Sequence, residues 1–290
     1  MSLFIQVFIG AVLQGALYTL GAFGLSLAFG VLRVLNLSHG DFVMLGGLLG
    51  YLALFHFGIH PFISAGLMLI LGFIVGIMFY RGLISRIMDR GQHEMLIASV
   101  MITLGVSLII EDTTNFLWGG GAIGIPFQMS NISVGGVVFP MLRVTLLSAT
   151  IVLTIALHFF LSRSFLGRAI LASAINPIGA VVVGINTRMV AMLTFGLGIA
   201  LTAGTGVFYA ALYSIEPFMG LNLTIKYLAV IVVGGLGSLP GAMIGGFIVA
   251  AAESYTSYYG GAEWSPMLAF VILILALLFR PQGLLGKGLA

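Results

Sequence analysis

The chain has 290 residues, of which 60% are hydrophobic and 7% are charged, and its mean hydropathy is +1.21. A soluble domain usually carries about 25% charged residues, because its exterior must be wetted. The composition therefore predicts an integral membrane protein and excludes a soluble enzyme, a nucleic-acid-binding protein and a disordered scaffold. The formal net charge of +3 comes from too few groups to indicate an acidic partner. The chain has no cysteine, which excludes disulfides and thiolate metal sites.

The N-terminal segment is apolar and carries no basic residue before Arg33. A cleaved signal peptide begins with a positively charged segment, which this chain lacks. We therefore expect the segment to be a retained membrane helix.

Eight apolar runs follow one another along the chain, and most are long enough for a helix that crosses a bilayer, which needs about 20 residues. They are continuous and do not alternate, which favours helices over barrel strands. The chain contains 41 glycines, and pairs such as Gly46/Gly50 and Gly72/Gly76 have the spacing of tight helix crossings. The runs are 3–32, 42–59, 62–80, 95–110, 144–161, 189–213, 227–252 and 266–279.

Arginines indicate which loops face the cytoplasm, because basic loops favour that side of the membrane. One basic loop, between the third and fourth runs, contains Arg81, Arg86 and Arg90. A second basic segment, 162–188, contains Arg163, Arg168 and Arg188. The intervening segment 111–143 has Arg143 as its single basic residue, so we expect it to be external. The two runs that flank 111–143 give the two crossings that this arrangement requires.

The C-terminal third needs a broken helix. Arg280 and Lys287 predict a cytoplasmic tail, whereas three simple spans after residue 188 would leave that tail outside. A short helix over 222–235, a break at 234–241 and a second helix over 241–257 restore the parity. Gly and Pro are tolerated at membrane depth only where other helices or a cavity satisfy the freed backbone groups. We therefore expect nine crossings in one transmembrane domain over 1–290, or ten if the long first run is also broken.

A polar stretch, 33–42, separates the first two runs without a turn long enough to be a loop. Its polar side chains, Asn36, Ser38, His39 and Asp41, are costly near a bilayer and indicate a translocation pathway or a conformational element. The alternative is a polar cytoplasmic turn in which Asp41 caps the next helix.

The sequence lacks motifs for metal binding, hydrolysis and nucleotide binding. The five histidines are scattered and no HExxH occurs, so we expect no metal site. The chain also has no GxSxG elbow, which leaves an intramembrane hydrolase unsupported. No Gly-Lys-Ser/Thr triplet occurs, so the chain has no P-loop and we expect it to bind no nucleotide cofactor itself.

Segment 162–188 is apolar and helix-forming for a turn or two, but arginines flank it and Asn176-Pro177 interrupts it. We expect no membrane-spanning helix there. A helix start at Pro177 with Asn176 as its cap fits the residues. Short cytoplasmic helices of this kind suit docking to a partner, and the alternative is a helix that lies in the membrane interface.

Four motifs resemble those of one family. Leu35-Asn36-Leu37-Ser38-His39-Gly40-Asp41 resembles the signature N-(F/L)-(A/S)-H-G-(E/D), and the stretch from Gly167 through Asn176-Pro177 to Asn186 resembles a cytoplasmic ATPase-docking loop. The other two are 234–246 and 280–286. Together they resemble the LivH-type permease of bacterial branched-chain amino acid ABC importers, and the match runs from roughly residue 5 to residue 286.

The resemblance implies an all-α polytopic membrane protein with about 8–10 transmembrane helices, some short or broken, in the ABC importer permease fold. It implies a place in the bacterial inner membrane and a function in translocating branched-chain or other hydrophobic amino acids. The partners would be a second, LivM-like permease subunit, two cytoplasmic ATPase subunits that bind ATP and Mg²⁺, and an extracytoplasmic substrate-binding protein. No nucleic acid would be a partner, and membrane lipid would surround the chain.

The same resemblance assigns candidate roles to residues of the motifs. The candidates for the translocation pathway or its gate are Asn36, Ser38, His39, Gly40, Asp41, Gly235, Gly237 and Pro240. The candidates for the ATPase-docking loop, 162–188, are Gly167, Arg168, Ala172, Asn176, Pro177 and Gly184.

Two alternative functions stay open. Similar permeases also serve importers for urea, short amides and aromatic or dicarboxylic acids. A stand-alone secondary transporter is the other alternative, but it usually has ionisable residues at mid-membrane. In this sequence the acidic residues, Asp41, Glu111, Asp112, Glu216, Glu253 and Glu263, are expected near the ends of the apolar runs.

Overall fold

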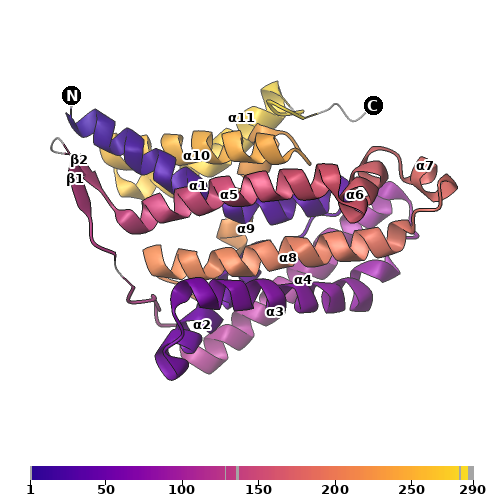
Figure 1. Cartoon of the computed structure of the whole chain (residues 1–290), viewed down its shortest axis with the longest axis horizontal. Coiled ribbons are helices and arrows are strands. Elements are labelled where there is room, and N and C mark those ends of the chain that lie inside the picture. The colour runs from indigo at the N-terminus through magenta and orange to yellow at the C-terminus, as the bar shows by residue number, and fades with distance from the viewer. Residues whose placement is uncertain (1, 128, 135–136, 281, 287–290) are drawn as a thin grey trace.

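The computed structural model describes residues 2–127, 129–134, 137–280 and 282–286. These residues form a bundle in which α1, α5 and α8 run along the longest axis of the molecule (Figure 1). The predicted apolar runs form nine helices: α1 (Ser2–Leu32), α2 (His39–Phe57), α3 (Pro61–Gly82), α4 (Gln92–Trp118), α5 (Met141–Arg163), α8 (Thr187–Leu212), α9 (Gly220–Gly234), α10 (Leu239–Tyr259) and α11 (Ser265–Phe279). Short 3-10 turns occur at Ile84–Arg86 and Ala262–Trp264.

Six of these helices are long and apolar enough to span a membrane alone, namely α1 to α5 and α8. The other three are short or broken, as the sequence predicts. α9 and α10 form a pair bent by 116° at their break, and α11 is a shorter apolar helix. With the bent pair counted as one span, the described residues contain up to seven spans. The long first run forms the single helix α1 and is not broken.

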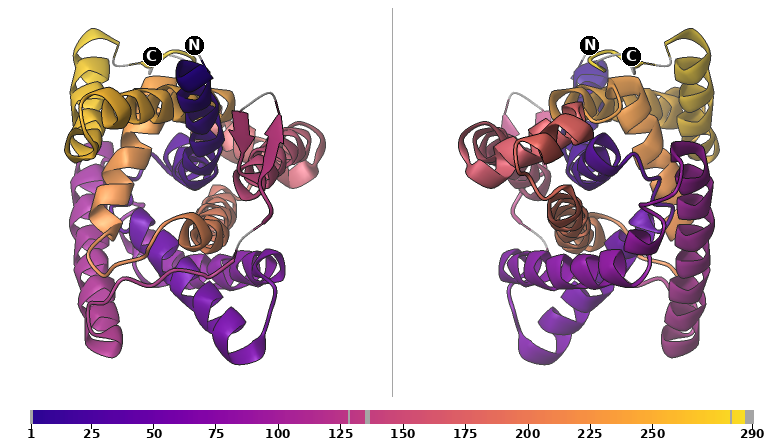
Figure 2. Two further views of the ribbon diagram at one scale, coloured as in Figure 1. Left: turned by 90° about the vertical axis from the view of Figure 1, so that its left-hand side faces the viewer. Right: turned by 90° about the vertical axis from the view of Figure 1, so that its right-hand side faces the viewer.

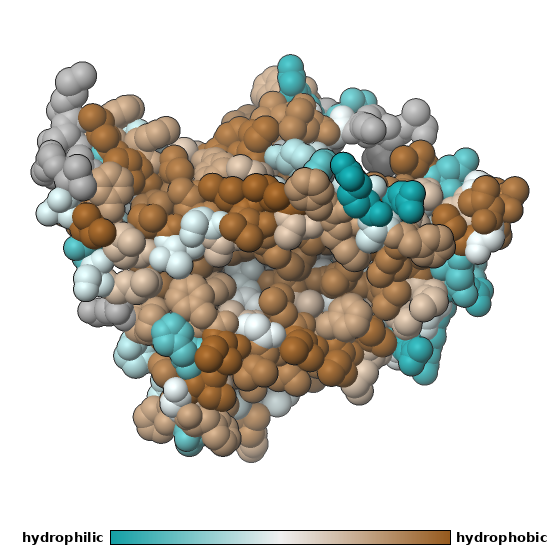
Figure 3. All heavy atoms as spheres, viewed as in Figure 1, coloured by the Kyte–Doolittle hydropathy of each residue, from teal (hydrophilic) through white to brown (hydrophobic). Residues whose placement is uncertain are grey.

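The core of the bundle lies around α1 and α8, which are apolar on all sides and are the most buried of the spanning helices. Phe23 of α1 and Phe195 of α8 are among the largest fully buried side chains. The outer helices instead expose apolar faces, with Ile70 of α3, Met101 of α4 and Val152 of α5 each more than 60% exposed. Figure 3 shows one such face, which hydrophobic residues largely cover. A surface of this kind fits a lipid environment.

Glycine allows the close crossing of α3 and α8, as the GxxxG spacing predicts. A Cβ at Gly72 would lie 2.9 Å from the Cβ of Ala203, and one at Gly76 would lie 2.8 Å from the Cα of Gly196. Such distances are too short for any larger residue, so the two helices pack backbone to backbone.

The loops gather at two opposite ends of the molecule (Figure 1). One, the hairpin end, carries an antiparallel pair that the sequence does not predict, β1 (Ile132–Val134) with β2 (Val137–Phe139), in which Ser133 pairs with Val138. The other, the α6–α7 end, carries α6 (Phe165–Ile175) and α7 (Pro177–Val182). Segments 111–143 and 162–188 therefore lie at opposite ends, as the arginines predict.

Contacts between loops confirm this arrangement. At the α6–α7 end, Arg188 Nη2 lies 2.7 Å from Asp89 Oδ1, which joins the start of α8 to the basic loop after α3. Toward the hairpin end, Ile123 forms a β-bridge with Ile215 in the connection between α8 and α9.

The predicted break in the C-terminal third is present. α9 ends at Gly234, and Pro240 lies in the first turn of α10. The C-terminal turn covers the break, because Leu284 N donates to Val233 O and Leu285 N donates to Gly234 O, both at 2.9 Å. Figure 2 shows α10 and α11 together along one edge of the bundle. Lys287, part of the predicted cytoplasmic tail, lies outside the described residues.

Candidate functional site

The polar stretch between α1 and α2 lies in the middle of the bundle. Asn36, Ser38, His39 and Asp41 are each at most 1% exposed. The stretch contacts three helices near their midpoints, at Gly21 of α1, Thr103 of α4 and Thr202 of α8. The interpretation as a polar cytoplasmic turn is therefore wrong. Ser38, not Asp41, precedes the first residue of α2, and Asp41 lies within its first turn.

The polar stretch interrupts the helical backbone between α1 and α2, and we name this interruption the Asn36–Asp41 break. Side chains provide hydrogen-bond partners for the backbone groups that it exposes. Asn36 Oδ1 accepts hydrogen bonds from Ser38 N at 3.1 Å and from Ser38 Oγ at 2.7 Å, which closes an Asx turn. Leu37 N donates to Thr103 Oγ1 at 3.0 Å, and Leu37 O accepts from Thr224 Oγ1 at 2.9 Å. Irregular backbone at this depth is stable only with such partners. The two threonines thereby tie the break to α4 and α9.

His39 joins three helices. Its Nε2 lies 2.9 Å from Gly21 O of α1 and 3.0 Å from Thr202 Oγ1 of α8. Because a carbonyl oxygen only accepts, Nε2 carries the proton in this arrangement. The ring also meets Tyr227 of α9 edge to face, with centroids 6.0 Å apart. His39 is thus a fixed junction and not a mobile surface group.

Gly40 and Asp41 bring the start of α2 against the start of α9. Gly40 N donates to Thr224 Oγ1 at 2.7 Å. The carboxylate of Asp41 lies against Gly220, the first residue of α9, so its charge faces the positive end of that helix dipole.

Neither carboxylate oxygen of Asp41 has a hydrogen-bond partner among the described residues, and Ser107 and Glu111 of α4 are neighbours. Buried ionisable groups of this kind in membrane proteins mark substrate or ion pathways.

Gly235, Gly237 and Pro240 do not join this group. They lie at the other end of α9, which is about 20 Å from Gly220 at 1.5 Å per residue. Gly235 has φ +114° and Gly237 has φ +78°, which favour glycine, and Gly237 packs against Gly30 near the end of α1. The predicted pathway residues thus form two separate groups.

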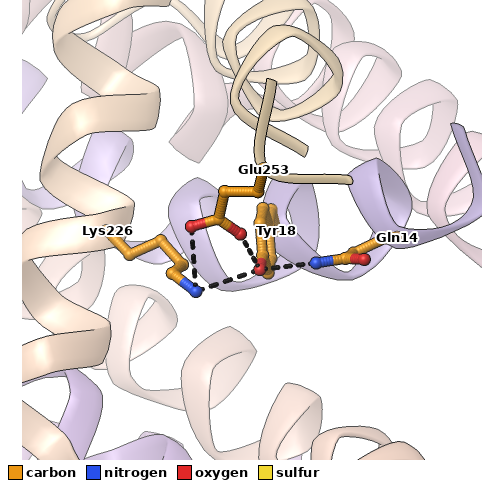
Figure 4. Close-up of polar contacts among 4 residues, drawn as sticks. All are labelled: Gln14, Tyr18, Lys226 and Glu253. Carbon is orange, nitrogen blue, oxygen red and sulfur yellow. Dashed lines mark hydrogen bonds and ion pairs between the residues drawn. The ribbon is translucent and has the colours of Figure 1, made fainter. Parts of the chain in front are cut away.

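Four residues outside the predicted motifs form a further polar cluster, which we name the polar quartet: Gln14 and Tyr18 of α1, Lys226 of α9 and Glu253 of α10 (Figure 4). Tyr18 and Glu253 are buried, and Gln14 and Lys226 are half-buried. Lys226 Nζ lies 3.1 Å from Glu253 Oε1 and donates to Tyr18 Oη at 3.0 Å. Tyr18 Oη donates to Glu253 Oε2 at 2.5 Å, and Gln14 Nε2 donates to Tyr18 Oη at 2.7 Å.

The quartet shows that an acidic residue near the end of an apolar run is not necessarily exposed. Glu253 is 1% exposed, and Asp41 and Glu111 are buried as well. A signal was present in the sequence, since a single Lys and a single Glu within apolar segments indicate a site. Tyr227, next to Lys226, contacts His39. The quartet and the Asn36–Asp41 break therefore both contact the first half of α9.

The predicted docking residues lie at the α6–α7 end. Asn176 caps α7, with Asn176 Oδ1 accepting from Gly179 N at 2.9 Å, and Pro177 lies in the first turn, which confirms the predicted helix start. Gly167 is buried and donates to Ser164 Oγ, while Arg168 is exposed. Ala172 is half-buried, and Gly184 has φ +84°.

An apolar patch lies at the same end as these predicted docking residues: Ile175, Ile178 and Val182 are 76%, 78% and 81% exposed. We name these three residues the docking patch. Among the described residues, no group of three or more His, Cys, Asp or Glu side chains could hold a metal ion.

Comparison with known proteins identifies relatives of nearly full length. BraD, the high-affinity branched-chain amino acid transport system permease protein of Pseudomonas aeruginosa, is 29% identical over 98% of this chain and 96% of its own length. LivH, the protein of the same description in Escherichia coli K12, is 30% identical over 98% of this chain and 96% of its own length.

A solved structure, PsaBC from Streptococcus pneumoniae in complex with Fab, is a more distant likeness. Its TM-score is 0.49 at 13% identity, with coverage of 96% of this chain and 91% of that chain. The family model described as the permease component of the branched-chain amino acid transport system matches residues 7–277. The chain therefore belongs to the family of permease components of branched-chain amino acid transport systems, and it is a multi-pass membrane protein.

Proposed function

We propose that this chain is a membrane-spanning permease subunit of an ATP-binding-cassette importer, which translocates branched-chain or other hydrophobic amino acids. The observation that carries the proposal is the family match over residues 7–277. The buried break at Asn36–Asp41 supports it. Broken helices with satisfied backbone groups at mid-depth are typical of substrate sites in transporters.

The docking patch supports a role for partner ATPases. Apolar side chains with this much exposure at the end of a bundle fit a protein interface, and the exposed Arg168 lies on α6, the helix that ends at Ile175. We assign this surface to two cytoplasmic ATPase subunits, which hold ATP and Mg²⁺. The alternative, that α6 and α7 lie flat in the membrane interface, fits less well because α7 projects from the end of the bundle (Figure 1).

The proposed contact with cytoplasmic ATPases implies the orientation of the chain in the membrane. The α6–α7 end and the C-terminus face the cytoplasm of a bacterial inner membrane, and the hairpin end faces an extracytoplasmic substrate-binding protein. A second, LivM-like permease subunit pairs with this chain. The same machine could instead serve urea, short amides or aromatic or dicarboxylic acids.

One observation favours a second function, a stand-alone secondary transporter. Asp41 and Glu111 are buried carboxylates in neighbouring helices, which is typical of ion-coupled carriers. We rank this function second, because the family match is to a permease component.

Reconstitution into liposomes separates these functions. The complete set of proteins, encoded with this chain and purified together, should import L-leucine only with ATP and the binding protein. This chain alone should show no uptake with a proton or sodium gradient. Uptake by the chain alone would support the secondary transporter. ATP-dependent uptake of urea, an amide or a dicarboxylic acid, without uptake of leucine, would assign one of the other substrates.

A further inference from the structure

Lys226 is the one basic residue within the spanning and bent-pair helices that the structure describes at mid-bundle depth, and its side chain is 20% exposed. An ammonium at this depth is too costly to leave in lipid, so it faces a water-filled path or another protein chain. We propose that the polar quartet binds the carboxylate of the transported amino acid. The inference rests on the proposed function and assigns the carboxylate contact of its substrate.

The geometry leaves donors free for an incoming anion. A lysine ammonium has three N–H donors. The described contacts of Lys226 are a hydrogen bond to Tyr18 Oη and an ion pair with Glu253 Oε1, and together they engage no more than two of these donors. A side-chain amide has two, and the described contact of Gln14 Nε2, to Tyr18 Oη, uses one. Each side chain therefore keeps one N–H for which the described residues show no acceptor.

These two donors are close enough to share one carboxylate. Lys226 Nζ and Gln14 Nε2 both lie within 3.0 Å of Tyr18 Oη, so they are no more than about 6 Å apart. Hydrogen bonds of about 2.9 Å from each donor let the two oxygens of one carboxylate bridge that distance. Figure 4 shows both side chains pointing toward the tyrosine hydroxyl from either side.

Glu253 determines what kind of anion fits. It is 1% exposed and holds Lys226, so the pair carries no net charge. A lone anion therefore gains little from the site, and a dicarboxylate would add excess negative charge. A zwitterionic amino acid brings a carboxylate without net charge. The quartet thus favours amino acids over urea, which lacks a carboxylate, and over dicarboxylic acids.

A purely structural role explains less of the arrangement. The quartet clips α1, α9 and α10 together, but apolar side chains of similar volume would do so without the cost of desolvating two charges. The partial exposure of Lys226 and Gln14 has no use in such a clip.

This chain has no cysteine, so Gln14→Cys gives a single reporter beside Lys226 in a complex whose partner chains are also made cysteine-free. The substitution removes the donor of Gln14, so leucine then binds through the donors of Lys226 alone. Without the binding protein, we expect the cysteine to react with an anionic methanethiosulfonate. If saturating L-leucine fills about 90% of the sites, it slows the reaction about tenfold. L-leucinol, which lacks the carboxylate, and acetate should give no protection. Adding Lys226→Met with Glu253→Gln, which keeps the pair neutral, should abolish protection by leucine.

Ser130→Cys, in the exposed loop near the hairpin end, is the control, and leucine should leave its labelling rate unchanged. An unreactive thiol in the Gln14→Cys variant, or equal protection by leucinol, would overturn the proposal. The proposed function fails separately, if the wild-type complex does not import leucine with ATP. Protection that survives in the variant with the neutral pair would assign the leucine site to residues other than Lys226.

Discussion

Gly40, in the first turn of α2, packs against Gly220, the first residue of α9, with no room for a side chain on either. A Cβ at Gly40 would overlap the carbonyl oxygen of Gly220, and a Cβ at Gly220 would overlap the carboxylate of Asp41. The starts of two helices that are far apart in the sequence thus meet at the centre of the bundle, and glycine at both positions makes that contact possible.

Alanine at either position should therefore separate α2 from α9. We expect Gly40→Ala and Gly220→Ala each to cost about 1–3 kcal/mol of unfolding free energy, as overpacking does, and to reduce transport per complex strongly. Thermal unfolding and uptake are measured on one preparation. Gly66→Ala in α3 is the matched control, because a Cβ there has nothing within 4 Å. Normal uptake in both variants would remove this contact from the candidate site.

His39 and Thr202 should be energetically coupled. His39→Ala removes the hydrogen bonds to Gly21 O and Thr202 Oγ1 and leaves a cavity, so we expect a loss of transport while the complex still assembles. A double-mutant cycle with Thr202→Val should give a coupling of about 1 kcal/mol in unfolding free energy.

Recovery of the ATPase by pull-down, measured beside uptake, separates transport from assembly in these variants. A coupling near zero would contradict the role of His39 as a junction. A loss of assembly in His39→Ala, before any loss of uptake per complex, would make the residue purely structural.

Local rules predicted the helices and their breaks. The apolar runs gave nine helices, Asn176-Pro177 gave the start of α7, and the glycines near Pro240 gave the bend between α9 and α10. Each of these features depends on residues that are close in the sequence, such as a cap, a fixed proline φ or a glycine at positive φ.

The depth of a residue in the bundle, and its contact partners on other helices, could not be predicted in the same way. The sequence showed that Asn36–Asp41 is polar, but its position at mid-bundle depends on contacts with Gly21, Thr103 and Thr202. The quartet was missed for a similar reason. Tyr18 and Glu253 are 235 residues apart, and only the tertiary packing of α1 on α10 brings them together.

The orientation of the molecule can be tested with introduced cysteines. We expect Ser130→Cys to react with an impermeant thiol reagent in intact spheroplasts, and Ile178→Cys to react only after the membrane is opened. Both positions are exposed, whereas Ser173 in α6 is 4% exposed and would label poorly at either side. The cysteine-free parent gives the background. Reversed labelling would place the α6–α7 end outside and contradict the proposed ATPase contact.

The docking patch should control the association with the ATPase. Val182→Asp places a charge in an exposed apolar surface, so we expect weaker recovery of the ATPase subunit and less ATP-driven uptake. Asn176→Ala removes the cap of α7, at a cost of about 1 kcal/mol in helix stability. It should likewise weaken recovery of the ATPase subunit and reduce ATP-driven uptake.

Asp89→Asn is the control for these variants. It removes an ion pair with Arg188 at the same end of the molecule, and both side chains are more than 70% exposed, so little stability depends on it. Full ATPase recovery with Val182→Asp would favour the alternative in which α6 and α7 lie in the membrane interface.

The two charges of the quartet should contribute unequally to stability. Lys226→Met leaves the carboxylate of Glu253 buried without its cation, so we expect a loss of about 3–5 kcal/mol in unfolding free energy. Glu253→Leu should cost less, because Lys226 is 20% exposed and can turn toward water. The double variant, with apolar side chains at both positions, should approach the stability of the wild type. Thermal unfolding of the purified complex checks all three.

The double variant separates packing from ligand binding. If the quartet serves only to clip α1, α9 and α10 together, restored stability should restore leucine uptake. If it binds the substrate carboxylate, the stable double variant should still fail to import leucine, because no donor remains at position 226. Arg188→Met, which breaks the exposed ion pair with Asp89, should leave stability within about 1 kcal/mol of the wild type. A double variant as unstable as Lys226→Met would show that the cost lies in packing around α9 and not in an unpaired charge.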